Sequence, residues 1–174
     1  MAKVSVQQID IDEKTVIREL QRNSNESIDG IAKRCGFSRQ KVWRIIKKLE
    51  GNQTIWGYHA IVDNERLHVK TYILFIKKTS KPFSEVINVI ISRDIEKDAA
   101  EMGIHIEDSL YLHGTFDWII IFTAEDIRQA KKFSEQFNRI YQNYVGETFL
   151  VEEIFPVKSC GVQNPNIKKL KEFG

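Results

Sequence analysis

The stretch IAKRCGFSRQKVWRIIKKLE, residues 31–50, decides the fold of the N-terminal part of the chain. Gly36 stands where a left-handed turn residue ends a helix, and Phe37 follows it as a core side chain. Ser38 is placed to cap a helix over residues 39–50, and Ser27 is placed to cap a shorter helix before it. Apolar residues at helical spacing line the inward faces: Ile28, Ile31, Ala32, Cys35, Val42, Ile45, Ile46 and Leu49. Two short helices joined by a tight, glycine-containing turn predict a helix-turn-helix.

The segments on either side complete this small module. Asp12 is expected to cap a first helix with an apolar stripe at Val16, Ile17 and Leu20. After residue 50, β-favouring residues are interrupted by Gly57, which predicts a short wing or a strand leading out of the domain. The module is therefore expected to be a winged helix-turn-helix of three helices.

The outer face of the predicted helix 39–50 is basic, with five Lys or Arg and one acidic residue between 38 and 50. In a recognition helix, the N-terminal residues meet base edges while Lys and Arg meet phosphates. Arg39 or Arg44 suits guanine, and Gln40 suits adenine. Trp43 can touch a thymine methyl, or pack on the wing or a dimer partner. The alternative is a solvated basic helix without a ligand. The candidate DNA-binding residues are Ser38, Arg39, Gln40, Lys41, Trp43, Arg44, Lys47 and Lys48, with Lys47 and Lys48 as phosphate contacts.

The middle of the chain alternates strands and helices. Pro82 is expected to open a helix that carries Phe83, Val86, Ile87, Ile90 and Ile91, and the charged segment 92–105 can prolong it. A capping box at 123–126 opens a second helix, whose apolar face is Ile127, Ala130, Phe133, Phe137, Ile140 and Tyr144. The predicted strands are 72–77, 109–113, 117–123 and 147–155. This βαββαβ order predicts a ferredoxin-like unit, and the chain as a whole is expected to be α+β.

Such a unit packs both helices on one face of its sheet. Either the set Tyr72, Leu74 and Ile76 or the set Ile73 and Phe75 must then face something other than those helices. An uncovered apolar sheet face indicates a partner, and a two-fold homodimer is the simplest one. Two recognition helices about one DNA turn apart would then read a pseudo-palindrome.

Several motifs in order resemble the leucine-responsive/asparagine regulator family, Lrp/AsnC. They are IDEKTVIRELQRN, IAKRCGFSRQKVWRIIKKLE and IWGYHAIVD, within residues 11–63, together with Gly114-Thr115-Phe116-Asp117 between the two middle strands. The resemblance implies dimers that assemble further, to tetramers or octamers, and an amino acid or related effector bound between subunits near Gly114, Phe116 and Asp117. The alternatives for this loop are a tight connection without a ligand and, for Asp117, a turn cap.

The charge distribution supports separate modules. The chain has 174 residues and a net charge of +2, which divides into +4 for 1–62, −5 for 63–156 and +3 for 157–174. We therefore expect a DNA-binding domain over 1–62, a dimerisation and effector domain over 63–156, and a basic tail over 157–174. The tail's lysines either add phosphate contacts or keep a frayed end soluble. No apolar run long enough for a membrane and no leader pattern is seen, so a cytoplasmic location is expected.

No pattern for catalysis or for a cofactor is recognised. His59, His68, His105 and His113 lack a metal-ligand spacing, and no P-loop, dinucleotide fingerprint or nucleophile elbow is present. The chain is thus predicted to be a sequence-specific DNA-binding transcription regulator and not an enzyme, with no cofactor and no metal. The alternative is a small-molecule-binding ferredoxin-like module whose helix-turn-helix mediates protein contacts.

Overall fold

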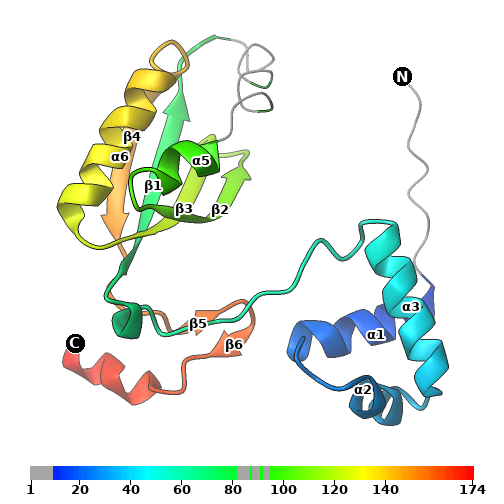
Figure 1. Cartoon of the computed structure of the whole chain (residues 1–174). Helices are drawn as coiled ribbons and strands as arrows, with labels where there is room; N and C mark the ends of the chain where they lie inside the picture. Colours follow the sequence, from blue (N-terminus) through cyan, green and yellow to red (C-terminus); the bar gives the residue numbers. More distant parts are fainter. Residues whose placement is uncertain (1–9, 82–86, 88–90, 92–94) are drawn as a thin grey trace. The chain divides into compact units, whose positions relative to one another are not determined.

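The computed structural model describes residues 10–81, 87, 91 and 95–174 (Figure 1). The chain divides into two compact units, Met1–Ile61 with Val157–Gly174, and Val62–Pro156. The domain boundaries expected from the sequence stay predictions. Among the described residues, no helix combines the length and the apolar character needed to cross a bilayer.

Three helices form the first unit: α1 (Ile11–Arg22), α2 (Ile28–Cys35) and α3 (Arg39–Gly51). Ser27 and Ser38 cap α2 and α3, as predicted, and Gly36 ends α2 in the left-handed region at φ 67°. The prediction that Asp12 caps α1 is wrong. Asp10 is the cap, because its side chain accepts a hydrogen bond from the Glu13 N–H at 2.8 Å. Asp12 lies in the first turn, where a carboxylate is also favourable.

The core of this unit is assembled from all three helices. Its buried members are Val16, Ile31, Ala32, Val42, Ile45 and Leu49. Phe37, Cys35 and Ile46 are only half-buried around it. The helix-turn-helix predicted from residues 31–50 is therefore confirmed.

The β-structure expected after α3, as a short wing or as a strand leading out of the domain, is absent, since none of the residues 52–63 is in a strand. The N–H groups of Thr54 and Ile55 both donate to the Leu49 carbonyl, so the chain folds back over the end of α3. A strand also needs a neighbour to complete its hydrogen bonds, and none of the described residues pairs with this segment.

The second unit is built on a four-stranded sheet of order β2-β3-β1-β4, in which every pair is antiparallel. The short 3-10 helix η1 (Asn64–Leu67) precedes the sheet. The other elements of the unit are β1 (Lys70–Lys78), α5 (Ile95–Ala100), β2 (His105–Tyr111), β3 (Trp118–Ala124), α6 (Ile127–Ile140) and β4 (Val145–Glu152). The α+β architecture and the ferredoxin-like strand order are confirmed. The helix expected from Pro82 falls mostly outside the described residues.

Several boundaries in this unit differ from the predictions. The strand β2 begins at His105, inside the segment expected to prolong a helix, because β3 supplies its hydrogen bonds and an edge strand tolerates charged residues. Asp126 and not Thr123 caps α6, and its carboxylate accepts from the Gln129 N–H at 2.9 Å. The helix α6 ends at Ile140, before Tyr144, and β4 ends before residue 153.

The two faces of the sheet differ in what covers them. Tyr72, Leu74 and Ile76 lie on the face that packs against α6, together with Ile120 and Phe122. The opposite face carries half-buried and exposed apolar side chains: Ile73, Phe75, Ile119, Ile121, Phe149 and Val151. We call this second face the open sheet face. It is the set Ile73 and Phe75, of the two left open by the sequence, that faces away from the helices.

The segment 157–174 is structured. It contains a short hairpin of β5 (Lys158–Ser159) and β6 (Val162–Gln163), followed by the 3-10 helix η2 (Ile167–Glu172). The interpretation of this segment as a frayed end is therefore wrong, because its own backbone hydrogen bonds hold it in a defined shape.

Candidate nucleic-acid interface

The helix α3 presents two different faces. Val42, Ile45 and Leu49 are buried against α1 and α2, which fixes the rotation of the helix. Gln40, Trp43 and Arg44 are exposed as a result, and Trp43 is 51% exposed despite its size. A large apolar ring held in water next to polar side chains is suited to contact a ligand surface. This part of the predicted interface is brought together by the structure.

Among the described residues, Arg44 has no acidic partner within ion-pair distance. The other four cations of α3 all have one. A guanidinium without an internal partner keeps its five donors for an external acceptor, and the paired acceptors of a guanine edge match its geometry. Arg44 is therefore the cation of α3 whose donors are most available to an external acceptor.

The first turn of α3 holds cations whose charges are partly compensated. The Lys41 Nζ lies 2.6 Å from the Asp12 carboxylate and 3.9 Å from the centre of the Phe37 ring. The Arg39 guanidinium lies 3.4 Å from the Asp29 carboxylate, and both of these side chains are about 70% exposed. Exposed pairs are weak, so phosphates can replace such carboxylates. The Ser38 hydroxyl accepts a hydrogen bond from the Lys41 N–H at 3.3 Å, so it serves as the helix cap.

Lys48 has a structural partner that the sequence did not suggest. Its Nζ donates to the Glu13 carboxylate of α1, whose side chain is only 5% exposed. This hydrogen bond to Glu13 raises the pKa of Lys48 above its ordinary value. A buried carboxylate needs a compensating charge, so Lys48 ties α3 to α1. The predicted phosphate contact at Lys48 would compete with this pair.

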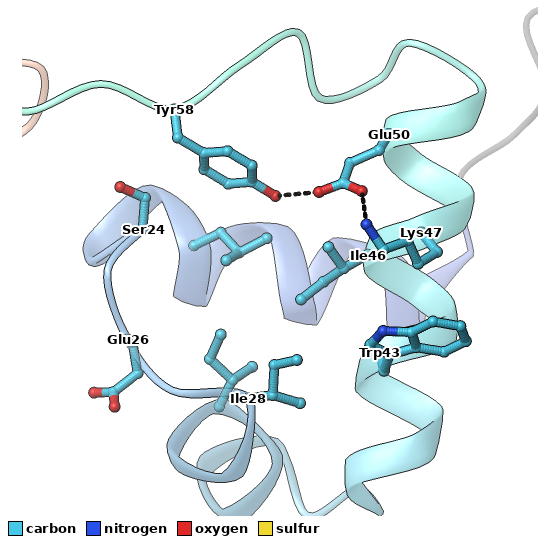
Figure 2. Close-up of a pocket in the computed structure, with 10 residues that line it drawn as sticks. Ser24, Glu26, Ile28, Trp43, Ile46, Lys47, Glu50 and Tyr58 are labelled. Atoms are coloured by element: carbon cyan, nitrogen blue, oxygen red, sulfur yellow. Dashed lines mark hydrogen bonds and ion pairs between the residues drawn. The ribbon is translucent and has the colours of Figure 1, made fainter.

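Lys47 belongs to a short chain of hydrogen bonds that also holds the segment leaving the unit. Glu50 accepts from the Lys47 Nζ at 2.8 Å and from the Tyr58 hydroxyl at 3.1 Å (Figure 2). The pKa of Glu50 is lowered, first by Lys47 and also by Tyr58, while burial raises the pKa of Tyr58. The three side chains line a hollow of about 330 Å³ whose apolar walls include Ile28 and Ile46. The exit segment is thereby fastened to the C-terminal half of α3.

The candidate set from the sequence omitted several residues that matter here. Glu13 decides how Lys48 is held, and Glu50 with Tyr58 decides how Lys47 is held. Trp56 was omitted as well, although it is 95% exposed just beyond α3. An aromatic residue in a polar segment was the available signal for Trp56. No local signal marks Glu13, since its partner Lys48 lies 35 residues away.

In the loop of residues 114–117, proposed to bind an effector, two of the candidate side chains contact other parts of the protein. The Asp117 carboxylate accepts from the Lys78 N–H at 3.0 Å and lies 3.6 Å from the Lys78 Nζ. The Phe116 ring packs 4.8 Å from the Phe75 ring and 5.7 Å from the Phe149 ring on the open sheet face. Gly114 is exposed. These contacts give Asp117 the role of fastening the loop to the end of β1.

The histidines do not gather into a metal centre. Within the described part of the chain, no group of three or more His, Cys, Asp or Glu side chains could hold a metal ion. Cys35 is half-buried, and burial raises the pKa of its thiol. Cys160 is exposed.

Comparison with protein families and curated proteins supports the helix-turn-helix. Residues 13–53 match the model of a winged helix-turn-helix DNA-binding family. PF0054 from Pyrococcus furiosus, described as an uncharacterized HTH-type transcriptional regulator, is 23% identical over 133 residues, which are 76% of this chain and 82% of the relative. The region that matches the family model, residues 13–53, contains all of the candidate DNA-binding residues.

Solved structures share the fold over most of the chain. The protein PH0061 has a TM-score of 0.69 and 20% identity, covering 91% of this chain and 98% of its own. An AsnC family transcriptional regulator from Agrobacterium tumefaciens has a TM-score of 0.61 and 19% identity, covering 86% and 93%. The regulator NMB0573 from Neisseria meningitidis, solved in complex with L-Met, has a TM-score of 0.63 and 14% identity, covering 86% and 92%. Residues 13–53 thus match a winged helix-turn-helix DNA-binding family, and the chain has the fold of solved Lrp/AsnC-type regulators.

Proposed function

We propose that this chain regulates transcription by binding specific DNA sequences as a homodimer, with α3 in the major groove. The observation that carries the proposal is the exposed set Gln40, Trp43 and Arg44, in which Arg44 lacks an internal acidic partner among the described residues. Arg44 and Gln40 read base edges, and Trp43 contacts an apolar part of a base. Lys41, Arg39 and Lys47 exchange their exposed carboxylate partners for phosphates, which position the helix without reading sequence.

The homodimer follows from the open sheet face. Phe149 and Val151 are each 45% exposed, and they lie beside the half-buried Ile73, Phe75, Ile119 and Ile121. A contiguous apolar face of this kind is costly in water, and packing against the same face of a second copy removes it. Larger assemblies, tetramers or octamers, would repeat this dimer. A regulator of this kind acts where the chromosome lies, so the cytoplasmic location is part of the proposal.

An amino acid or similar small molecule is proposed as the effector. The support is the likeness of fold to NMB0573 and to a feast or famine regulatory protein from M. tuberculosis, both solved with L-methionine. Gly114, Phe116 and Asp117 remain the candidate contacts. Since Asp117 already binds the Lys78 backbone, its contribution would be to hold the loop in shape beside the ligand.

The proposal is tested by footprinting and gel shifts with the full chain on genomic fragments, with and without a panel of amino acids. Arg44→Ala is expected to weaken binding to the selected fragment by about 1–3 kcal/mol and to relax specificity. Arg18→Ala is the matched control, because it removes the same charge from an exposed position of α1. The footprint should show two half-sites about 34–36 Å apart, one helical turn, or a multiple of this. Equal binding to genomic and random DNA, with Arg44→Ala behaving like the control, would refute the proposal.

A further inference from the structure

The C-terminal segment 157–174 is a small scaffold held by its own hydrogen bonds. In the β5–β6 hairpin, the two turn residues Cys160 and Gly161 both have positive φ, 44° and 86°. Two successive residues with positive φ form a turn whose twist matches that of the two strands it joins. The Asn164 N–H then donates to the Val157 carbonyl at 3.1 Å, which closes the base of the hairpin. The segment can therefore present side chains from defined positions.

The helix η2 places two lysines on one side of this scaffold. A 3-10 helix has three residues per turn, so Lys168 and Lys171 lie above one another, about 6 Å apart along the axis. Ile167 and Leu170 form a second, apolar row by the same rule. The Lys169 N–H donates to the Asn166 carbonyl at 2.9 Å, and the Phe173 N–H donates to the Leu170 carbonyl at 3.2 Å, which hold this turn closed.

The basic charge of this segment exceeds its acidic charge. The segment has a net charge of +3, from four lysines and one glutamate, and all four lysines are exposed. Among the described residues, Lys158, Lys168 and Lys171 have no acidic partner within ion-pair distance. This differs from α3, where four of five cations are paired. Free cations on a fixed scaffold fit a polyanion better than they fit a neutral or basic partner.

We propose that the segment 157–174 is a second DNA-contacting surface, which binds backbone phosphates through Lys158, Lys168 and Lys171. The inference rests on the proposed function, since it takes the same duplex as its partner. Phosphate contacts add affinity and salt dependence but carry no sequence information. The segment therefore strengthens binding to any duplex, while α3 selects the sequence.

The test compares the full chain with K168Q/K171Q and K168R/K171R on the selected fragment and on random duplex of equal length. The binding constant is measured against salt concentration. Each lost phosphate contact lowers the slope of log K against log salt by about 0.9, so K168Q/K171Q should flatten the slope by ~1.8 on both DNAs. K168R/K171R keeps both charges and should keep the slope of the unmodified chain.

The outcomes separate this inference from the proposed function. Normal specific binding with an unchanged slope for K168Q/K171Q overturns the inference and leaves the proposed function standing. A change in oligomeric state without a change in slope also overturns it, because the segment would then contact protein. A flatter slope on both DNAs, with the preference for the selected fragment retained, supports it. Absence of DNA binding by the unmodified chain overturns both.

Discussion

The outer face of α3 and the loop of residues 114–117 both place a charged side chain beside an aromatic ring, but they use the charge differently. On α3, Arg44 stands next to the exposed Trp43 and has no internal acidic partner among the described residues. In the loop, the Asp117 carboxylate is bound to the backbone and the ammonium of Lys78, and Phe116 packs on two other rings. A charge without an internal partner can meet a ligand at little cost, whereas an engaged charge must first leave its partner. The comparison favours α3 as a binding surface and the loop as a fastening.

The largest effect is expected from Lys48, whose predicted role was a phosphate contact. Lys48→Met leaves the Glu13 carboxylate of α1 buried without a compensating charge, so it should lower Tm more than any other of these substitutions. Lys47→Met is the matched control, because its partner Glu50 is 32% exposed and water can replace the lysine. Thermal unfolding measures both.

For DNA binding, the substitution of Lys47 should have a larger effect than the substitution of Lys48. Lys47→Met should flatten the salt slope by about one, since the exposed pair of Lys47 with Glu50 can be exchanged for a phosphate. If Lys48→Met left Tm unchanged and flattened the slope, Lys48 would belong to the DNA interface and its pair with Glu13 would be of no consequence.

An intermediate effect is expected at Asp117. Asp117→Ala removes the acceptor of the Lys78 N–H and should lower the free energy of unfolding of the second unit by about 1–2 kcal/mol. Asp117→Asn keeps an acceptor oxygen and should recover most of this loss. Urea denaturation followed by tryptophan fluorescence measures the difference. Unchanged stability of both variants, together with a lost response to amino acids, would show that Asp117 contacts a ligand. The loop would then be a binding surface and not a fastening.

The smallest effect is expected from Glu153, next to the end of β4. Burial raises the pKa of this carboxyl, and the charge of Glu107 adds to the shift. The folded state therefore holds the Glu153 proton more tightly than the unfolded chain, so the contribution of this group to stability is greatest at low pH and declines as pH rises from 4.5 through the raised value.

Glu153→Gln should remove that decline and slightly raise Tm at pH 7, with a flatter dependence of Tm on pH. Glu152→Gln is the neighbouring control, because Glu152 pairs with Lys70 at 2.6 Å and its loss should not raise Tm. A steeper pH dependence in Glu153→Gln would contradict the assignment.

Features of the fold that depend on short sequence separation could be predicted. Ser27, Ser38 and Gly36 act within a few residues of themselves, and the buried positions of α3 repeat at helical spacing, so the helix-turn-helix could be recognised. The alternation of strands and helices likewise predicted the ferredoxin-like order. Local rules failed where two candidates stood close together, as with Asp10 and Asp12, or where a polar strand such as β2 depends on its neighbour.

Residue types in the sequence predicted the candidate site, and the ion pairs seen in the structure corrected the roles of its residues. The sequence by itself determined that α3 is a capped, amphipathic, basic helix, because periodicity and capping are local properties of the chain. Only the tertiary structure decided which cations remain free, because Glu13 and Lys48 are 35 residues apart, and Lys78 and Asp117 are 39 apart. It also decided that the segment 157–174 is a closed scaffold, since such hydrogen bonds form only once the backbone has folded. Ion-pair partners that are distant in sequence determine the charge of a surface, and residue type alone does not reveal which residues will pair.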